Sequence, residues 1–269
     1  MMASLRFTIL GCGSSGGVPR LGGDWGTCDP TNAKNRRRRC SMLVERISGD
    51  ARTRVLIDTS PDMREQLLDA GVGELDGVVF THSHADHTHG IDDLRQIVFN
   101  TGNRLPVWAD GPTENALIAR FGYAFVQPQG SPYPPILDLN AITDAPFSVD
   151  GPAGPIRFAP FTADHGAMQA LGFRIGNLAY LPDAVALPQE SWDCLHGLEV
   201  WVVDALRRKP HPTHAHLAMT LDWIARAKPA RAVLTNMHLD MDYETLRAEL
   251  PMGITPAYDG MAITLDDIA

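Results

Sequence analysis

The stretch VVFTHSHADHTHG, residues 78–90, decides what kind of fold this chain can adopt. Four of the 10 histidines fall between His82 and His89, with one acid, Asp86, among them. The apolar run before them is typical of a buried strand, and the polar residues begin where that strand would end. Ligands usually bind at the carboxyl ends of strands in α/β sheets, so we expect a binding site here.

The spacing of these polar residues indicates a site for metal ions. His82 and His84 place two imidazoles within reach of one cation, while Asp86 and His87 can serve a second. Imidazole together with carboxylate suits Zn²⁺, Mn²⁺ or iron. The alternative is a surface histidine cluster that binds no metal.

Length, charge and composition narrow the class of protein. A length of 269 residues is enough for one large domain or two small ones. The hydrophobic content of 44% is enough to build a core. The formal net charge of -9 argues against broad nucleic-acid binding, which depends on neutralising phosphates. The N-terminus MMASLRFTIL has no signal-peptide pattern, and no apolar window is long enough to span a membrane. We therefore expect a cytoplasmic protein with reduced cysteine thiols.

Strand-like and helix-like patterns alternate along much of the chain. Apolar, β-branched runs predict strands at 6–10, 41–47, 54–58, 77–81, 155–161, 171–175, 178–181, 200–204, 231–235 and 261–265. Helical patterns fall at about 61–70, 91–99, 113–122, 217–227 and 242–249. The Pro- and Gly-rich segment 122–154 interrupts them, and we interpret it as a lid or excursion within one domain spanning 1–269.

Several motifs together resemble a known family. H-x-H-x-D-H after an apolar strand is the signature of the metallo-β-lactamase fold. GCGSSGGVPR (11–20), LIDTSPD (56–62), HTHGIDDLR (87–95) and LTNMHLDMDYETL (234–246) are similar to motifs of one of its branches. That branch contains the phosphoribosyl cyclic phosphate phosphodiesterases and, more distantly, the tRNA 3′-processing endoribonucleases. The resemblance implies an α/β fold, a four-layer αββα sandwich of the metallo-β-lactamase type, with two divalent metal ions, Zn or Mn.

The same resemblance implies the metal ligands. The first metal would be bound by His82, His84 and His165, the second by Asp86, His87 and His238, with Asp183 shared between them. One position departs from the family, because its last ligand is a His after a strand reading LTH and this chain reads LTN, with Asn236. Side chains two apart along a strand share a face, so we predict His238 as the ligand, with Asn236 or water as alternatives.

Two further residues near these ligands receive roles. Asp58 ends the run RVLID, and in this fold such an acid orients a metal-bound histidine from behind, which fixes its tautomer. His89 is left over, and we assign it to packing or to contacts behind the ligands.

The candidate catalytic residues are His214 and the ligand Asp86. The stretch PHPTHAHLAM (210–219) carries His214 where phosphodiesterases of this branch place their catalytic His. Protonation of a leaving alkoxide needs such a group. His216 is a second candidate that would bind substrate or cap the helix from Leu217.

Two other polar segments have open interpretations. Ser14 and Ser15 in the Gly-rich loop would help to cradle a phosphate, or else the loop is only a tight turn. The basic run NRRRR (35–39) is a solvated loop or steers phosphate toward the site.

The segment LGGDWGTC (21–28) keeps only Cys28 of the family's structural zinc cluster, so no structural zinc is expected.

These observations predict a dinuclear metal-dependent phosphodiesterase that hydrolyses a small cyclic or nucleotide-like phosphodiester by metal-bound hydroxide. A tRNA 3′-processing endoribonuclease-like nuclease is one alternative, which the short and non-basic 122–154 segment argues against. A non-catalytic sensor of a phosphate ligand is another. The expected partner is the small phosphodiester, with no membrane and no extended nucleic acid, and a homodimer is left open.

Overall fold

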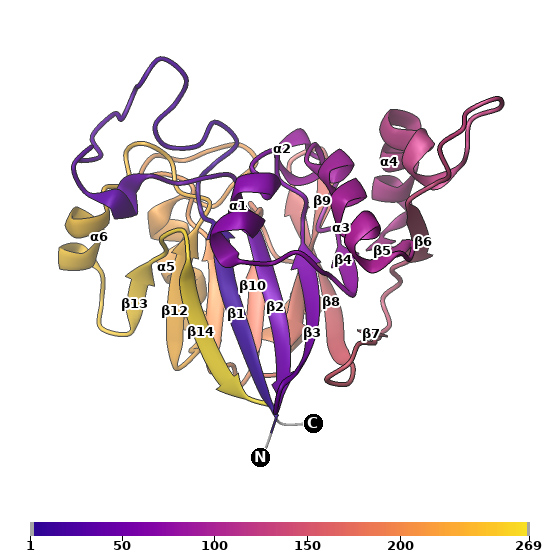
Figure 1. The fold of residues 1–269 in the computed structure, drawn as a ribbon. Coiled ribbons are helices and arrows are strands. Elements are labelled where there is room, and N and C mark those ends of the chain that lie inside the picture. Colours follow the sequence, from indigo (N-terminus) through magenta and orange to yellow (C-terminus); the bar gives the residue numbers. More distant parts are fainter. Residues whose placement is uncertain (1–2, 268–269) are drawn as a thin grey trace. The chain divides into compact units, whose positions relative to one another are not determined.

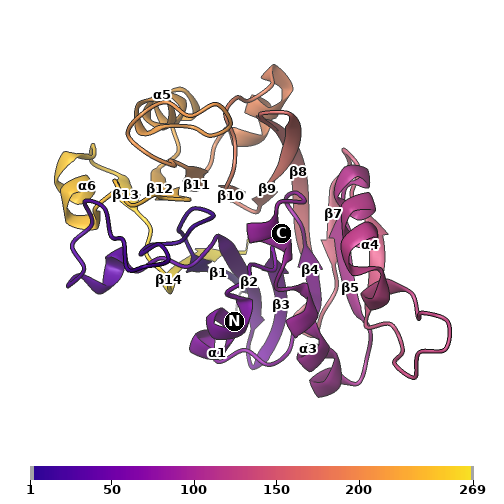
Figure 2. The same cartoon turned by 90° about the horizontal axis from the view of Figure 1, so that it is seen from above.

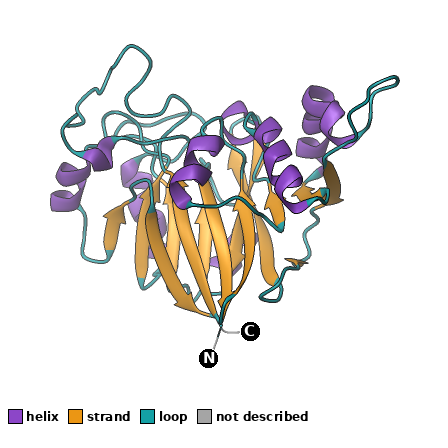
Figure 3. Cartoon of the chain, in the orientation of Figure 1, coloured by secondary structure: helices purple, strands orange, loops and turns teal. Residues whose placement is uncertain are grey.

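The computed structural model describes residues 3–267, which form two compact units. Unit 1 comprises residues 3–10, Ser41–Arg157 and Ala262–Asp267, and unit 2 comprises Gly11–Cys40 and Phe158–Met261. Each unit contains a β-sheet with helices, as Figures 1 and 3 show. The expectation of one domain over 1–269, with 122–154 as a lid, stays a prediction.

Unit 1 contains a seven-stranded sheet in the order β14-β1-β2-β3-β4-β5-β6. Its strands are β1 (Ser4–Gly11), β2 (Ser41–Ser48), β3 (Ala51–Ile57), β4 (Gly77–Val79), β5 (Leu105–Ala109), β6 (Leu137–Ala141) and β14 (Met261–Asp266). The hairpin β2–β3 is antiparallel, and β3, β4, β5 and β6 pair in parallel. The carboxyl ends of β3 and β4 therefore lie at the same edge of this sheet.

Helices cover one face of this sheet. They are α1 (Met63–Ala70), the 3₁₀ turn η2 (Ile91–Asp93), α3 (Leu94–Thr101) and α4 (Gly111–Phe125), while the short α2 (Ala85–Thr88) follows the end of β4. In Figure 2, α1 and α3 lie along the same side of the strands β2–β4. Met63 of α1, Leu94 of α3 and Leu117 of α4 pack in one buried cluster with Leu56 and Val78 of the sheet. Burying such side chains contributes roughly 1.5–3 kcal/mol each.

Local signals in the sequence account for the helix ends. Gly71 ends α1 with φ 65°, a left-handed conformation that glycine adopts without steric cost. Asp110 begins α4, because its side chain accepts a hydrogen bond from the N–H of Thr113 and Pro112 follows it. The segment 122–154 contains some regular secondary structure. It includes the last residues of α4, all of β6 and the short strand β7 (Phe147–Val149).

Unit 2 is built on the strands β13-β12-β11-β10-β9-β8 of the second sheet. Their bounds are β8 (Ile156–His165), β9 (Met168–Ile175), β10 (Leu178–Leu181), β11 (Val200–Asp204), β12 (Arg231–Thr235) and β13 (Ile254–Pro256). β8, β9 and β10 are antiparallel, whereas β10 to β13 are parallel. β10 and β11 are buried along their whole length, as expected for central strands covered on both faces.

The helices of unit 2 are α5 (Leu217–Ala227), α6 (Tyr243–Glu249) and the 3₁₀ turns η1 (Ala33–Asn35) and η3 (Gln189–Leu195). Figure 3 shows that Gly11–Cys40 is mostly loop. Arg37 fixes part of that loop, because its buried guanidinium donates to the carbonyl of Met241 at 2.7 Å.

The predicted strands are all present within a few residues of their predicted bounds. β5, β6, β7 and β13 were not predicted, because Pro106 interrupts the pattern of β5 and the others are short or polar. Cys12, Cys28 and Cys40 are buried and Cys194 is half-buried. Within residues 3–267, none of the helices has both the length and the apolar character that crossing a membrane would require.

Candidate metal centre

The histidine motif of unit 1 lies directly beyond the end of β4. The chain leaves the strand at Val79, passes Phe80 and Thr81, and turns into α2 at His84. His82 and His87 are fully buried. The ring atoms His82 Nε2 and His84 Nδ1 lie 3.1 Å apart, and His87 Nε2 lies 3.6 Å from Asp86 Oδ2. The four predicted unit 1 ligands therefore form two close pairs.

Asp58 organises this motif from the end of β3. It has φ 63°, in the left-handed region, and its carboxylate is fully buried. Oδ1 accepts the N–H of Thr81 at 2.8 Å, while Oδ2 accepts the Thr81 hydroxyl and His87 Nδ1, both at 2.7 Å. Burial raises the pKa of Asp58, and the His87 ring and the Thr81 donors oppose that rise. Holding Nδ1 fixes the His87 tautomer that presents Nε2 as an acceptor.

Three parallel strands of unit 2 end in polar residues at one edge. Asp183 follows β10, Asp204 is the last residue of β11, and Asn236 follows β12. The strand register pairs Leu181 with Val203 and Asp204 with Thr235, so these three side chains are neighbours. The Asn236 amide nitrogen lies 3.3 Å from both Asp183 Oδ1 and Asp204 Oδ1. Sequence reasoning missed Asp204, although an acid at the end of VWVVD was the available signal.

His165 stands at the end of β8 beside Asp183. Its Nδ1 donates to the carbonyl of Thr213 at 2.7 Å, and its Nε2 lies 3.5 Å from Asp183 Oδ2. The Thr213 carbonyl can only accept, so Nδ1 carries the proton and Nε2 has the lone pair. His165 is therefore held in the tautomer that a metal ligand requires.

His214 is held next to the same acids. Its Nδ1 lies 3.0 Å from Asp204 Oδ2 and 3.9 Å from Asp183 Oδ2. Its ring meets that of His165 edge-on, with centroids 4.6 Å apart. Burial raises the pKa of Asp204 to about 6, although the His214 ring acts to lower it. The side chain of His214 is 15% exposed, so it has access to solvent that the buried Asp204 lacks.

Asn236 and His238 do not share a face, contrary to the reasoning that favoured His238. β12 ends at Thr235, and Asn236 adopts φ 60°, which breaks the alternation of an extended strand. Asn236 turns toward the acids, whereas His238 Nε2 meets the guanidinium of Arg20, and its Nδ1 lies 3.3 Å from Asp240 Oδ1. Burial and the Arg20 charge lower the pKa of His238, which favours the neutral ring.

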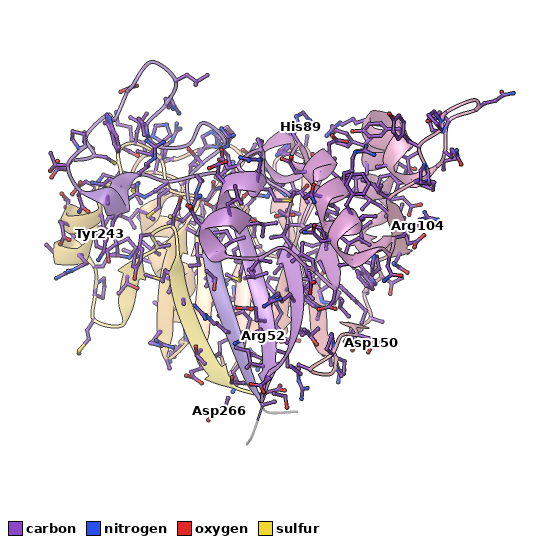
Figure 4. The ribbon with its side chains drawn as sticks, viewed as in Figure 1. Arg52, His89, Arg104, Asp150, Tyr243 and Asp266 are labelled. Carbon is purple, nitrogen blue, oxygen red and sulfur yellow. The ribbon has the colours of Figure 1, made fainter. Side chains whose placement is uncertain are left out.

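The remaining predicted residues have varied surroundings. Ser14 is buried and Ser15 exposed. His216 occupies the N-cap position of α5 without a capping hydrogen bond from its ring. His89, which Figure 4 labels, packs edge-on against Phe121 with ring centroids 5.5 Å apart.

The Arg run is not simply a solvated loop. Arg37 is buried, and Arg38 forms an ion pair with Asp259 at 3.1 Å. These two arginines therefore fasten the loop within unit 2.

The donor set fits divalent cations. Two nitrogens bound to one tetrahedral Zn²⁺ lie about 3.3 Å apart, given Zn–N distances of about 2.0–2.1 Å. Within unit 1 the His82–His84 and His87–Asp86 pairs lie at 3.1 and 3.6 Å, and within unit 2 the His165–Asp183 pair lies at 3.5 Å. The ring nitrogens that His82, His87 and His165 turn to these pairs are all Nε2. Each pair is spaced as two ligands of one ion would be.

A family model described as the beta-lactamase superfamily domain matches residues 53–237, which include this donor set up to Asn236. The chain belongs to the beta-lactamase superfamily. The predicted α/β fold of the metallo-β-lactamase type is therefore confirmed. The enzymes of this fold are mostly hydrolases.

Individual relatives have varied names. The crystal structure of a new diphosphatase from the PhnP family is similar over 99% of both chains, with 34% identity and a TM-score of 0.88. An octanoyltransferase of Porphyromonas gingivalis is 35% identical over 98% of this chain, which spans only 52% of that protein. The Zn²⁺-bound PqqB of Methylobacterium extorquens shares the fold, with 17% identity, a TM-score of 0.73, and 97% of this chain and 100% of that chain covered.

Proposed function

We propose that the protein is a dinuclear metal-dependent phosphodiesterase that acts on a small cyclic or nucleotide-like phosphodiester. Three findings support the proposal: membership of a mostly hydrolytic fold family, similarity to a diphosphatase over nearly the whole chain, and a donor set that fits divalent cations. The observation that carries it is the His214–Asp204 pair beside Asp183.

We propose the ligand set that the family resemblance implies. His82, His84 and His165 would bind one ion and Asp86 and His87 the other, with Asp183 shared and His238 or Asn236 completing the second set. The two cations, Zn²⁺ or Mn²⁺, would activate water at neutral pH and polarise a phosphoryl oxygen. The contacts of Asn236 with Asp183 and Asp204 support Asn236 as the alternative to His238, whose ring contacts Arg20.

His214 would supply the proton that the leaving alkoxide needs. Asp204 accepts from Nδ1, so the proton delivered to substrate comes from Nε2. A buried carboxylate behind the ring stabilises its protonated form and fixes its orientation. The Asn236 amide nitrogen lies 3.2 Å from the same Nδ1, but it donates to Asp183 and Asp204, so Asp204 is the acceptor that holds the ring.

Cleavage of a phosphoanhydride is a second candidate reaction. The PhnP-family relative is a diphosphatase, and it is 34% identical over 99% of this chain. The same residues would act, since a phosphate leaving group needs less help from a proton donor than an alkoxide does. The rate of hydrolysis of a diphosphate would therefore depend less on His214 than the rate of hydrolysis of a diester.

The test is hydrolysis of bis(p-nitrophenyl) phosphate by the metal-loaded protein and by His214→Ala. We expect wild-type turnover and a loss of about 10²–10⁴-fold in the variant, with both metals retained. His196→Ala is the matched control, because His196 is exposed and contacts Arg174 only through its backbone carbonyl. Cleavage of pre-tRNA without any diester turnover would overturn the proposal in favour of a nuclease. Two bound metals with neither activity would support a sensor. A cytoplasmic location stays a prediction, and a homodimer stays open.

A further inference from the structure

A pocket of 510 Å³ lies in unit 1 between α3, α4 and the loop that follows α4. It is lined by Arg95, Phe99, Tyr123, Pro128, Ser131, Tyr133 and Pro134. Its volume falls within the range of small-molecule sites, roughly 300–1,000 Å³. Nothing in the proposed reaction uses these residues.

The pocket exposes aromatic rings. Phe99 is 67% exposed and Tyr133 is 69% exposed, although large apolar side chains are usually buried. Tyr123 adds a third ring at 42% exposure, and two prolines add flat apolar faces. Rings gathered around a concave space offer stacking surfaces for a planar ligand.

Asp92 does not line the pocket itself but contacts two residues that do, Arg95 and Tyr123. Asp92 Oδ1 accepts from Arg95 Nη2 at 3.1 Å and from the Tyr123 hydroxyl at 2.9 Å. The guanidinium has further N–H donors, and the carboxylate has further acceptor sites. A heteroaromatic ring with donors and acceptors along its edge, as in a nucleobase, complements both the stacking faces and this pair.

The loop that closes the pocket is held by its own hydrogen bonds. The Gln127 amide donates to the Ser131 carbonyl at 2.7 Å, and the Ser131 N–H donates to the Pro128 carbonyl at 3.0 Å. The Ile136 N–H donates to the Ala124 carbonyl at 2.8 Å, which ties the loop back to α4. The stacking surface is thus built into the fold.

Helix α4 connects this pocket with the histidine motif. Arg120 donates to the backbone carbonyl of Ser83, between the two histidines of the H-x-H motif, and Phe121 packs against His89. Tyr123 lies three residues after Arg120 in α4, although the helix is kinked between them at Phe121, which has φ -129° and ψ 28°. One elongated molecule can therefore place a phosphate at the motif and a ring in the pocket.

We infer that this pocket binds the heteroaromatic base of a nucleotide-type substrate, an inference that rests on the proposed phosphodiesterase function for the position of the phosphate. Phe99 and Tyr133 stack on the base, and the Arg95–Asp92 pair meets its edge. These residues set substrate specificity and take no part in the chemistry.

Binding of adenosine to the full-length protein tests the pocket separately from catalysis, because adenosine has no phosphate for a metal to capture. We expect isothermal titration to show saturable binding, with Kd raised about tenfold in Phe99→Ala and in Tyr133→Ala. Both side chains are exposed, so the variants should fold. Val126→Ala is the control, since Val126 is 66% exposed at the start of the same loop and does not line the pocket.

Kinetics with a matched substrate pair complete the test. Adenosine 2′,3′-cyclic phosphate carries the base, and the 2,3-cyclic phosphate of methyl riboside lacks it. We expect kcat/KM to favour the first, and the pocket variants to remove that preference through KM while leaving the second unchanged.

Absence of adenosine binding, an unchanged Kd in both variants, or equal kcat/KM for the two substrates would overturn the inference. Adenosine binding that depends on Phe99 and Tyr133, with no hydrolysis of either substrate or of bis(p-nitrophenyl) phosphate, would uphold the pocket and refute the phosphodiesterase.

Discussion

Asp58→Asn tests how the buried hydrogen bonds of unit 1 prepare its histidines for metal. An ionised Asp58 only accepts, so the Thr81 hydroxyl donates its single proton to Oδ2. The contact of the same hydroxyl with His82 Nδ1, at 3.0 Å, must then use His82 as donor. His87 Nδ1 likewise donates to Asp58. One carboxylate thereby sets Nε2 as the lone-pair nitrogen of two histidines.

Asparagine would reverse these directions. Its carbonyl oxygen would remain opposite the Thr81 N–H, which needs an acceptor, so its NH₂ group would face His87 Nδ1 and the Thr81 hydroxyl. His87 Nδ1 would then accept, and the proton would move to Nε2. The Thr81 hydroxyl, now an acceptor from the amide, would donate to His82 Nδ1 and shift that ring as well.

The expected cost falls on metal affinity. Loss of a group that orients a ligand typically weakens metal binding 10–100-fold. Because Asp58 serves two rings, we expect the upper end, about 100-fold, or about 2.7 kcal/mol. Thr81→Val keeps the Asp58–His87 contact and removes the Thr81 hydroxyl, with its hydrogen bonds to Asp58 and His82, so it should cost about tenfold in metal affinity.

The assay is Zn²⁺ affinity by competition with a chelating dye, with urea unfolding in chelator to show that each variant is folded. ¹⁵N NMR of the imidazoles without metal reports the tautomers directly. Asp58→Asn with wild-type affinity and unchanged tautomers would refute the reasoning. So would a Thr81→Val variant as weak as Asp58→Asn, because it would place the whole effect in Thr81.

Two further outcomes are expected for unit 2. Asp259 accepts hydrogen bonds from the N–H of Cys12 and from Arg38, and burial raises its pKa to about 6. The folded state therefore binds this proton more tightly than the unfolded chain, and the contribution of Asp259 to stability falls as pH rises from about 4 to about 6. The stability difference between wild type and Asp259→Asn should change by about 2–3 kcal/mol across that window in urea titrations, and a pH-independent difference would contradict it. Gly166→Ala would put a Cβ 2.4 Å from Thr213 Cγ2 at φ 71°, whereas Gly197→Ala, at φ 67°, meets nothing within 4 Å. The Gly166 variant should lose about 1–3 kcal/mol more than Gly197→Ala by urea unfolding, and equal losses would show that Thr213 moves freely.

Much of the fold could be read from local patterns. Apolar runs predicted strands such as 200–204 and 231–235 with the bounds that the structure has, and α5 begins at Leu217 and ends at Ala227 as its pattern indicated. These elements can be predicted from the sequence because each buries either a periodic apolar face or a continuous run of apolar residues. β6 and β7 do not, since they are short and half-exposed.

The sequence by itself determined the family and the candidate ligands, because H-x-H-x-D-H concentrates metal-binding side chains within a few residues of one strand end. Apart from Asp58, which the family resemblance implied, only the tertiary structure revealed the groups that hold them. Asp204 reaches His214 because parallel strands align their carboxyl ends, and Thr213 reaches His165 across 48 positions of chain. It also showed that the side chains of Asn236 and His238 have different partners, because the left-handed conformation of Asn236 ends the side-chain alternation of β12. Spacing along the chain encodes local geometry, whereas partners far apart in sequence are decided by how strands pair and where each one ends.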